Sequence, residues 1–261
     1  MAFALNALTF GAFFLYNWSM NFFINRSQIE NEYIYISGSD VNHIKNVLRK
    51  NIGDVIELVC DEKKYSARIV EFNQDVIKCC IVEEEIVDTN DFKLTIFQGL
   101  AKSDKIEFII QKCTEIGVYE IIPVEMKRSV VRLDGKDKTK KIERWKKIAE
   151  AASKQSRRNF ILKVDKIASF NQMCDELNNY DCILLAYENE KNIFLKDVIR
   201  NNIEKYSNVA VIIGPEGGFD EEEVKKLVEI GAKSVSLGKN ILRTETAPVV
   251  ISAIIMYEKN Q

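Results

Sequence analysis

The chain has 261 residues, of which 46% are hydrophobic and 29% are charged, and its formal net charge at pH 7 is −2. This composition predicts a globular protein with one large domain or two smaller ones, and the near-neutral charge by itself indicates no class of partner. The six cysteines contain no CxxC pair and His43 is the only histidine, so no metal site is expected and a Ser/His or Cys/His hydrolase has one candidate base. We expect the cysteines to be buried free thiols in a reducing cytoplasm.

Residues 1–19 carry no charged side chain and, with the next five residues, are just long enough to span a bilayer. They lack the basic start and the small-residue cleavage site of a signal peptide. Met20 then opens a stretch that resembles an ordinary N-terminus. We therefore expect residues 1–19 to be a start-site extension outside the fold, with a membrane anchor as the alternative, and we expect the protein to be cytoplasmic.

Residues 20–90 are expected to form a small β-barrel that carries one helix. Short stretches rich in Val, Ile, Tyr and Cys alternate with turn residues and predict strands, namely YIYIS, DVIELVC, KYSARIVEF and DVIKCCIVEE. After the first of them, residues 39–50 place Val41, Ile44, Val47 and Leu48 on one helical face. His43 lies beside that face, which favours a structural histidine over a catalytic one.

After a linker at residues 88–92, strands alternate with helices throughout a second domain at residues 91–261. Continuous apolar runs predict strands at 93–100, 119–125, 181–188, 208–214 and 233–238. Helices are expected after the first, second, fourth and fifth of these strands, and Asp104 and Glu107 have the spacing of a capping box at the start of the first helix. This alternation predicts a parallel sheet with helices on both faces.

The segment from Lys127 to Arg158 is strongly basic. It holds thirteen Lys and Arg against four Asp and Glu, a net charge of +9, so the remainder of the chain carries −11. A solvated helix face is one explanation of such a run. An excess this uneven favours a polyanionic partner.

A glycine-rich turn, residues 214–218, follows the strand at 208–214. It lacks the Lys and Ser/Thr of a Walker loop and the spacing of a dinucleotide-binding loop. Asp220 and Glu223 have capping-box spacing, so carboxylates of the next helix would satisfy the amides that a phosphate needs. The turn therefore favours a neutral or cationic ligand, and a purely structural turn is the alternative.

A second loop, residues 237–247, follows the last strand and leads into the terminal helix. Ligands of parallel sheets bind beyond the carboxyl ends of strands, so the two loops can form one pocket. Their amides and carbonyls suit a purine edge, and Leu237, Ile241 and Leu242 supply apolar walls.

These two loops and three longer blocks carry a resemblance to a known family. The loops read IGPEGGF at 213–219 and LGKNILRTETA at 237–247, and the blocks lie at 43–54, 102–131 and 143–158. Together they resemble the RsmE family of 16S rRNA uridine-N3 methyltransferases, within the SPOUT superfamily. The resemblance runs from about Met20 to the end of the chain, with small departures at Ser103, Arg157 and Ala247.

The resemblance implies an α/β fold in which an N-terminal PUA-like β-barrel precedes a SPOUT domain with a parallel sheet and a C-terminal trefoil knot. It implies a homodimer that uses S-adenosylmethionine to methylate N3 of a specific uridine in 16S rRNA, within the small ribosomal subunit. The sulfonium of that cofactor suits a turn that disfavours phosphate. The alternatives are a SPOUT methyltransferase acting on tRNA or large-subunit rRNA, and a non-catalytic RNA-binding assembly factor.

The matched positions also imply where the cofactor and the reaction lie. The implied cofactor-binding residues are Leu185, Ala186, Gly214, Pro215, Glu216, Gly217, Gly218, Leu237, Gly238, Ile241, Leu242, Arg243, Thr244, Thr246 and Ala247. Arg243 and Glu245 are the catalytic candidates. Arg243 stays protonated and is expected to bind phosphate or to stabilise the uracil anion. Glu245 and Glu216 are candidates for ion pairing or proton transfer, and bracing of their own loops is the alternative.

Contacts with rRNA are expected along the matched basic blocks and on the helix of the barrel. The residues expected to make them are Arg49, Lys102, Lys105, Arg128, Arg132, Gln155 and Arg158. Phosphate contacts make binding steeply salt-dependent, and a flipped or single-stranded uridine suits an active site of the pocket type.

Overall fold

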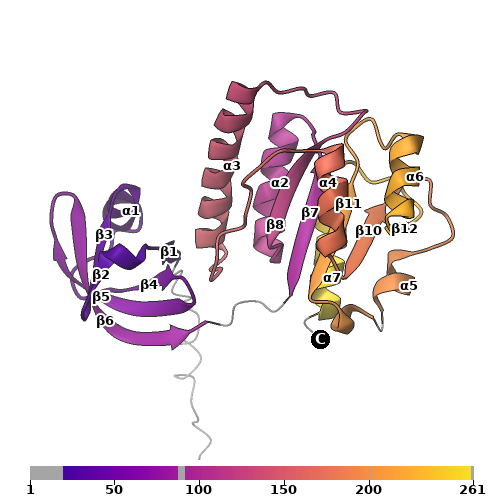
Figure 1. The fold of residues 1–261 in the computed structure, drawn as a ribbon. Helices are drawn as coiled ribbons and strands as arrows, with labels where there is room; N and C mark the ends of the chain where they lie inside the picture. Colours follow the sequence, from indigo (N-terminus) through magenta and orange to yellow (C-terminus); the bar gives the residue numbers. More distant parts are fainter. Residues whose placement is uncertain (1–19, 88–91, 201, 260–261) are drawn as a thin grey trace, which may run out of the picture. The chain divides into compact units, whose positions relative to one another are not determined.

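The computed structural model describes residues 20–87, 92–200 and 202–259. The expected extension at residues 1–19 and most of the expected linker at 88–92 lie outside these ranges. The chain forms two compact units, one that ends at Glu85 and one that begins at Ile86 and also takes in Asp61–Lys63 (Figure 1). Within the described ranges, no helix is both long enough and apolar enough to cross a membrane.

The first unit is a six-stranded sheet in the order β1-β4-β5-β6-β3-β2. Its strands are β1 (Asn21–Phe23), β2 (Ile29–Glu30), β3 (Tyr33–Ser37), β4 (Val55–Cys60), β5 (Lys63–Phe72) and β6 (Val76–Ile86). The four expected strands are present. The short β1 and β2 were not expected, because two or three residues are too few to display an alternating pattern.

The expected helix at 39–50 is shorter and changes its winding. It begins as α1 (Ser39–Asn42) and continues as a π-helical turn over His43–Val47. The wider π-helical turn moves Val47 off the expected apolar face, so Val47 is exposed while Val41 and Ile44 are buried. The His43 ring meets the Phe22 ring edge-on with centroids 6.0 Å apart, which is the packing of a structural histidine.

The second unit is a six-stranded parallel sheet in the order β12-β10-β11-β7-β8-β9, as the alternation of strands and helices predicts. Its strands are β7 (Lys93–Gly99), β8 (Glu120–Glu125), β9 (Ala168–Ser169), β10 (Cys182–Ala186), β11 (Asn208–Ile213) and β12 (Lys233–Val235). All five expected strands are present, and the two-residue β9 extends the sheet at one edge.

Helices cover both faces of this sheet, each over its own apolar core (Figure 1). One core receives α2 (Ser103–Ile116), α3 (Gly135–Gln155), α5 (Leu195–Ile199) and α7 (Thr246–Lys259). The other receives α4 (Phe170–Glu176) and α6 (Glu221–Glu229). The capping box expected from Asp104 and Glu107 is absent, because α2 begins at Ser103 and so takes Asp104 into its first turn. Instead, the Ser103 hydroxyl donates to Glu107.

Candidate functional site

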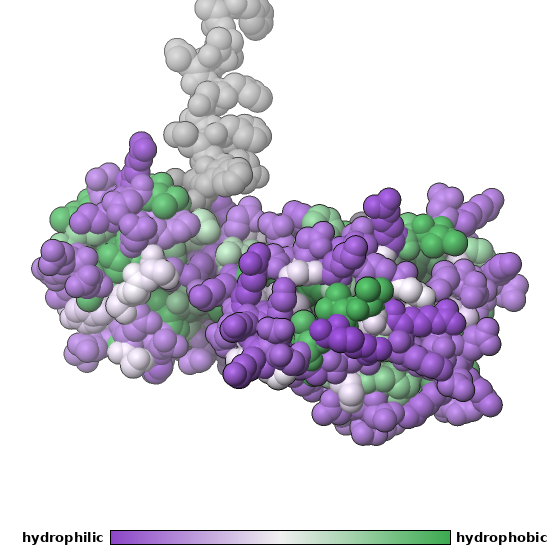
Figure 2. All heavy atoms as spheres, turned by 90° about the horizontal axis from the view of Figure 1, so that it is seen from above, coloured by the Kyte–Doolittle hydropathy of each residue, from purple (hydrophilic) through white to green (hydrophobic). Residues whose placement is uncertain are grey.

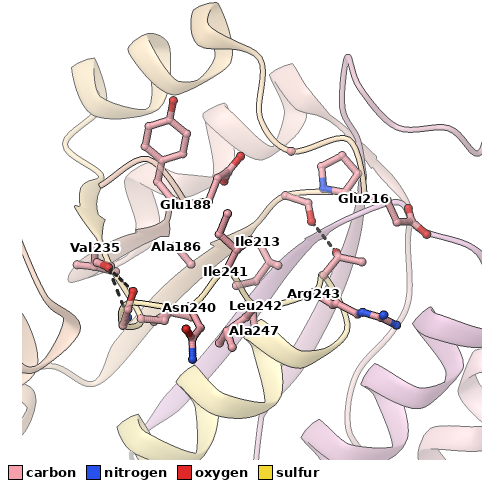
Figure 3. Close-up of a pocket in the computed structure, with 18 of the residues that line it drawn as sticks. Ala186, Glu188, Ile213, Glu216, Val235, Asn240, Ile241, Leu242, Arg243 and Ala247 are labelled. Carbon is pink, nitrogen blue, oxygen red and sulfur yellow. Dashed lines mark hydrogen bonds between the residues drawn. The ribbon is translucent and has the colours of Figure 1, made fainter. Parts of the chain in front are cut away.

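A cavity of about 500 Å³ opens at the carboxyl ends of three neighbouring strands (Figure 3). The last residues of β10, β11 and β12, which are Ala186, Ile213 and Val235, all line it. The loops that follow these strands form the rest of the wall, together with Ala247 of α7. Its volume lies within the range of about 300–1,000 Å³ that is usual for small-molecule sites.

Thirteen of the fifteen expected cofactor-binding residues line this cavity, and the exceptions are Leu185 and Thr246. Neighbouring residues of a strand face opposite sides of a sheet, so Leu185 is buried in the core under α4 and α6 while Ala186 reaches the cavity. Thr246 begins α7, and its amide donates to the carbonyl of Arg243. Neither residue therefore lines the cavity in this structure.

Several residues that line the cavity were not expected there; they are Tyr187, Glu188, Ile213, Val235, Ser236, Lys239 and Asn240. Glu188 is the most informative, because a Cβ atom placed on Gly218 would lie 2.6 Å from its Oε1. The Glu188 carboxylate therefore lies directly against the glycine-rich turn, and Figure 3 shows it at the cavity. A carboxylate two residues beyond a buried strand was the available signal in the sequence.

The glycine-rich turn packs tightly against its neighbours. A Cβ on Gly217 would lie 2.8 Å from the carbonyl oxygen of Arg128, and Gly218 has a φ of +70°, which favours glycine. The predicted capping box of α6 is present, since the Asp220 carboxylate accepts from the Glu222 amide and Glu223 accepts from the Asp220 amide. Carboxylates thus occupy the site where a phosphate would bind, as the sequence predicts.

A hydroxyl joins the two loops of the cavity. Thr244 donates to the carbonyl of Gly214 over 2.6 Å and accepts from the side-chain amide of Gln98 over 2.9 Å. Gln98 is fully buried near the end of β7 and was not singled out from the sequence. Three strands therefore contribute to one fixed pocket edge.

The other polar cluster at this edge centres on Lys105 of α2. Its Nζ lies 3.5 Å from Oε1 of Glu216 and 3.2 Å from Oε2 of Glu245. The Lys102 amide also donates to Glu216, whose carboxyl points away from the cavity in Figure 3. Lys105, expected at the RNA, thus lies between two carboxylates.

The carboxyl of Glu245 stays ionised in this setting. Burial acts to raise its pKa, but interactions with its own backbone amide, with Lys105 and with Arg243 outweigh burial and hold the pKa below the ordinary value. Arg243 lies on the same loop with an 83% exposed side chain, and its Nη1 is 4.0 Å from Oε1 of Glu245. Such a carboxylate suits ion pairing better than proton transfer.

One expected RNA contact is wrong. Arg158 is buried, and its guanidinium donates to the carbonyls of Thr114, Gly117 and Val118 at the end of α2. The guanidinium carbon also lies 4.0 Å from the centroid of the Phe160 ring. This arginine is a structural residue, because its donors hold a helix end in place and do not face solvent.

The remaining expected RNA contacts lie at the surface, but acids pair with much of the basic segment. Exposed among them are Arg49, Lys102, Arg128, Arg132 and Gln155. Ion pairs join Lys127 to Asp220 and Glu222, Lys138 to Glu125, Arg144 to Glu107 and Lys146 to Asp165. Hydrophilic residues cover most of the face seen in Figure 2. The excess of +9 therefore overstates the charge that is free to meet a polyanion.

The chain matches known protein families in both units. The RNA methyltransferase domain family matches residues 88–256, and the RNA methyltransferase PUA domain family matches residues 36–74. Ribosomal RNA small subunit methyltransferase E of Bacillus subtilis (strain 168) is 38% identical over an alignment of 246 positions, which covers 90% of this chain and 94% of that protein. The protein of the same name from Mesomycoplasma hyopneumoniae (strain 232) is 35% identical, with 88% and 96% covered.

Solved structures resemble the whole described fold. One is a ribosomal RNA small subunit methyltransferase E from Neisseria gonorrhoeae bound to S-adenosylmethionine, which is 30% identical to this chain. Its superposition has a TM-score of 0.80 and covers 90% of this chain and 96% of the other. A methyltransferase from Legionella pneumophila, in complex with the same cofactor, is 26% identical with a TM-score of 0.80, covering 92% and 97%.

Proposed function

Because this chain belongs to the family of ribosomal RNA small subunit methyltransferases E, we propose that it transfers a methyl group from S-adenosylmethionine to 16S rRNA. The observation that carries the proposal is the cavity beyond β10, β11 and β12, in a chain whose 30% identical structural relative is bound to that cofactor. The proposed target is N3 of one uridine in the small ribosomal subunit, and the proposed location is the cytoplasm.

The residues around the cavity fit this cofactor. Bare glycines let the backbone approach a ligand, and Leu237 and Ile241 offer apolar walls for a purine. The carboxylate of Glu188 and the capped start of α6 suit a ligand with positive charge and disfavour a phosphate. We retain the thirteen lining residues as the proposed cofactor contacts, without Leu185 and Thr246.

When bound, the cofactor supplies an electrophilic methyl group on a sulfonium. The chain's own contribution is to hold uracil N3, after its proton has passed to solvent, in line with that group. Alignment of this kind accounts for about 7–11 kcal/mol of a barrier. Arg243 is the proposed group that contacts the substrate and stabilises negative charge on the ring. Its exposed side chain at the cavity edge supports this role. Glu245 is proposed to brace its loop.

We further propose a C-terminal trefoil knot in the second unit. The loop after β12 starts at the edge of the sheet, and its Thr244 reaches Gly214 at the end of β11 and Gln98 near the end of β7. A path that passes the ends of three strands before α7 supports threading of this kind.

The proposed boundary between the RNA-binding barrel and the catalytic domain is near residue 90.

A homodimer is proposed with its interface near the cavity. Ile241 on the second loop is 81% exposed, and Ile254 and Tyr257 on α7 are exposed apolar residues as well. A second copy that covers them would bury apolar surface beside the cofactor.

The proposed contacts with rRNA are five exposed residues, namely Arg49, Lys102, Arg128, Arg132 and Gln155.

The test is transfer of a labelled methyl group from S-adenosylmethionine to small subunits from a strain that lacks the modification, followed by reverse transcription of 16S rRNA. A methyl on N3 blocks the Watson–Crick edge, so one new stop at a uridine is the expected result. Incorporation without a stop would move the methyl to another atom or base. With intact subunits, no incorporation would reject the proposal and favour another RNA substrate or a non-catalytic assembly factor.

A further inference from the structure

Glu245 lies between two cations that differ in distance and exposure. The Lys105 ammonium is 3.2 Å from Oε2, and its side chain is 25% exposed. The Arg243 guanidinium is 4.0 Å from Oε1, at the limit of an ion pair, and its side chain is 83% exposed. Glu245 is therefore held by Lys105, and Arg243 remains available to other groups.

Lys105 comes from a different element than Arg243 and Glu245. It belongs to α2, whereas Arg243 and Glu245 lie two residues apart on the loop after β12. Its other partner, Glu216, also accepts from the Lys102 amide and so keeps one hydrogen bond without Lys105. Removal of the ammonium would therefore leave Glu245 with Arg243 as the cation already within 4.0 Å.

We propose that Lys105 is a positioning residue that occupies Glu245 and thereby keeps Arg243 free to meet the RNA substrate. This inference rests on the proposed function, in which Arg243 contacts that substrate. In the absence of Lys105, the guanidinium would turn back onto Glu245, because an arginine and a carboxylate form a strong paired contact. The substrate would then lose its cationic contact while the residues around the cofactor stay in place.

A direct contact between Lys105 and an RNA phosphate fits the geometry less well. The ammonium faces two carboxylates whose side chains are about one-fifth exposed, and both oppose the approach of an anion. A purely structural brace is the remaining explanation. Lys105 could thus position Arg243, contact a phosphate or brace the structure. These three explanations predict different RNA affinities when the Glu245 carboxylate is removed together with Lys105.

The experiment compares Lys105→Met with two double variants of the full chain. Lys105→Met/Glu245→Gln removes the carboxylate that would capture Arg243. Lys105→Met/Glu216→Gln is the matched control, because it removes the other partner of Lys105 and leaves Glu245 charged. Methyl transfer to small subunits, RNA affinity at several salt concentrations, S-adenosylmethionine affinity by calorimetry and Tm are measured for each, with Lys105→Gln as a second neutral variant at position 105.

We expect Lys105→Met to lower kcat and RNA affinity by about tenfold, with cofactor affinity changed by less than about threefold. The variant that also lacks the Glu245 charge should recover most of the RNA affinity, and the Glu216 control should not. A further variant, Lys105→Met/Arg243→Ala, should bind RNA almost as well as Lys105→Met. In Lys105→Met the Arg243 guanidinium is already paired with Glu245 and no longer contacts the RNA.

Equal RNA affinities for Lys105→Met and both double variants would overturn the inference, as would unchanged RNA affinity in Lys105→Met. A loss confined to cofactor affinity and Tm would assign a structural brace instead. The proposed function fails separately, if the wild-type chain transfers no methyl group. RNA affinity still decides the role of Lys105 in that case.

Discussion

The Thr244 hydroxyl donates a 2.6 Å hydrogen bond to the carbonyl of Gly214, thirty residues earlier in the chain. Thr244 belongs to the loop after β12, and Gly214 follows the end of β11. The same hydroxyl accepts from Gln98 at the end of β7, so one side chain satisfies polar groups from two other strands. The cavity thus has a fixed edge where its two loops meet.

Replacement of Thr244 by valine should loosen this edge. Valine keeps the shape but leaves the Gly214 carbonyl and the Gln98 amide without this partner, at a cost of about 1–3 kcal/mol in the free energy of unfolding. Urea denaturation measures that loss, and calorimetry should show weaker binding of S-adenosylmethionine. Thr139→Val on the exposed surface of α3 is the control, with an expected change below about 0.5 kcal/mol. Equal losses in both variants would contradict the prediction.

Gly99 should not tolerate alanine, because a Cβ there would lie 2.4 Å from the backbone nitrogen of Pro215. The end of β7 and the glycine-rich turn would have to separate, which we expect to destabilise the fold by about 1–3 kcal/mol and to weaken cofactor binding. Gly135→Ala at the start of α3 meets no atom within 4 Å and should be neutral or slightly stabilising. Urea denaturation measures the stability of both variants. A Gly99→Ala protein as stable as Gly135→Ala would refute the close approach of Gly99 to Pro215.

Arg243→Ala should abolish methyl transfer while cofactor affinity stays within about threefold of the wild type. The side chain is largely exposed at the cavity edge, so its loss removes a substrate contact, while the Arg243 backbone and the other lining residues stay in place. Single-turnover transfer and calorimetry separate the two effects. Lys239→Ala, on the same loop, is the comparison for a general loss of positive charge. Wild-type turnover in Arg243→Ala would exclude the proposed role.

Neighbouring cysteines should react differently with an alkylating reagent at pH 8. Burial raises the pKa of the Cys79 thiol to about 12, so almost no thiolate is present there, while the side chain of Cys80 is partly exposed. Mass spectrometry of the native protein should find Cys80 modified well before Cys79, and unfolding should remove the difference. Similar native rates at both residues would contradict the burial of Cys79.

The sequence predicts the strands and the two pocket loops well, because continuous apolar runs and glycine turns are local signals. It does not predict which residues approach the loops from elsewhere. Gln98 and Thr244 are 146 residues apart in the chain, and Lys102 and Glu216 are 114 apart. No local pattern identifies such pairs, so Gln98 was missed and Lys105 was assigned to the RNA.

Two other expectations differ from the structure for physical reasons of the same kind. The family resemblance implies a cofactor contact at Leu185, but adjacent residues of a buried strand face opposite sides, so Leu185 packs in the core and Ala186 lines the cavity. The matched basic block predicts Arg158 as a contact of the RNA, whereas the structure buries its side chain. Its burial depends on the packing of the end of α3 against the end of α2, which charge counting does not detect.

Substitution of Arg158 should therefore lower stability, whereas substitution of Arg132 should weaken RNA binding. Arg158→Met removes the side-chain donor from three carbonyls, of which only that of Thr114 also accepts from a backbone amide, that of Gly117, among the hydrogen bonds of the described residues, so we expect a loss of at least about 2 kcal/mol in unfolding free energy. Arg132 is exposed, and Arg132→Ala should leave stability nearly unchanged, weaken RNA binding and reduce the slope of log affinity against log salt by about one. Urea denaturation and RNA titration at several salt concentrations measure both. If Arg158→Met proved as stable as the wild type but bound RNA with the reduced salt slope, the original assignment of Arg158 to the RNA would be restored.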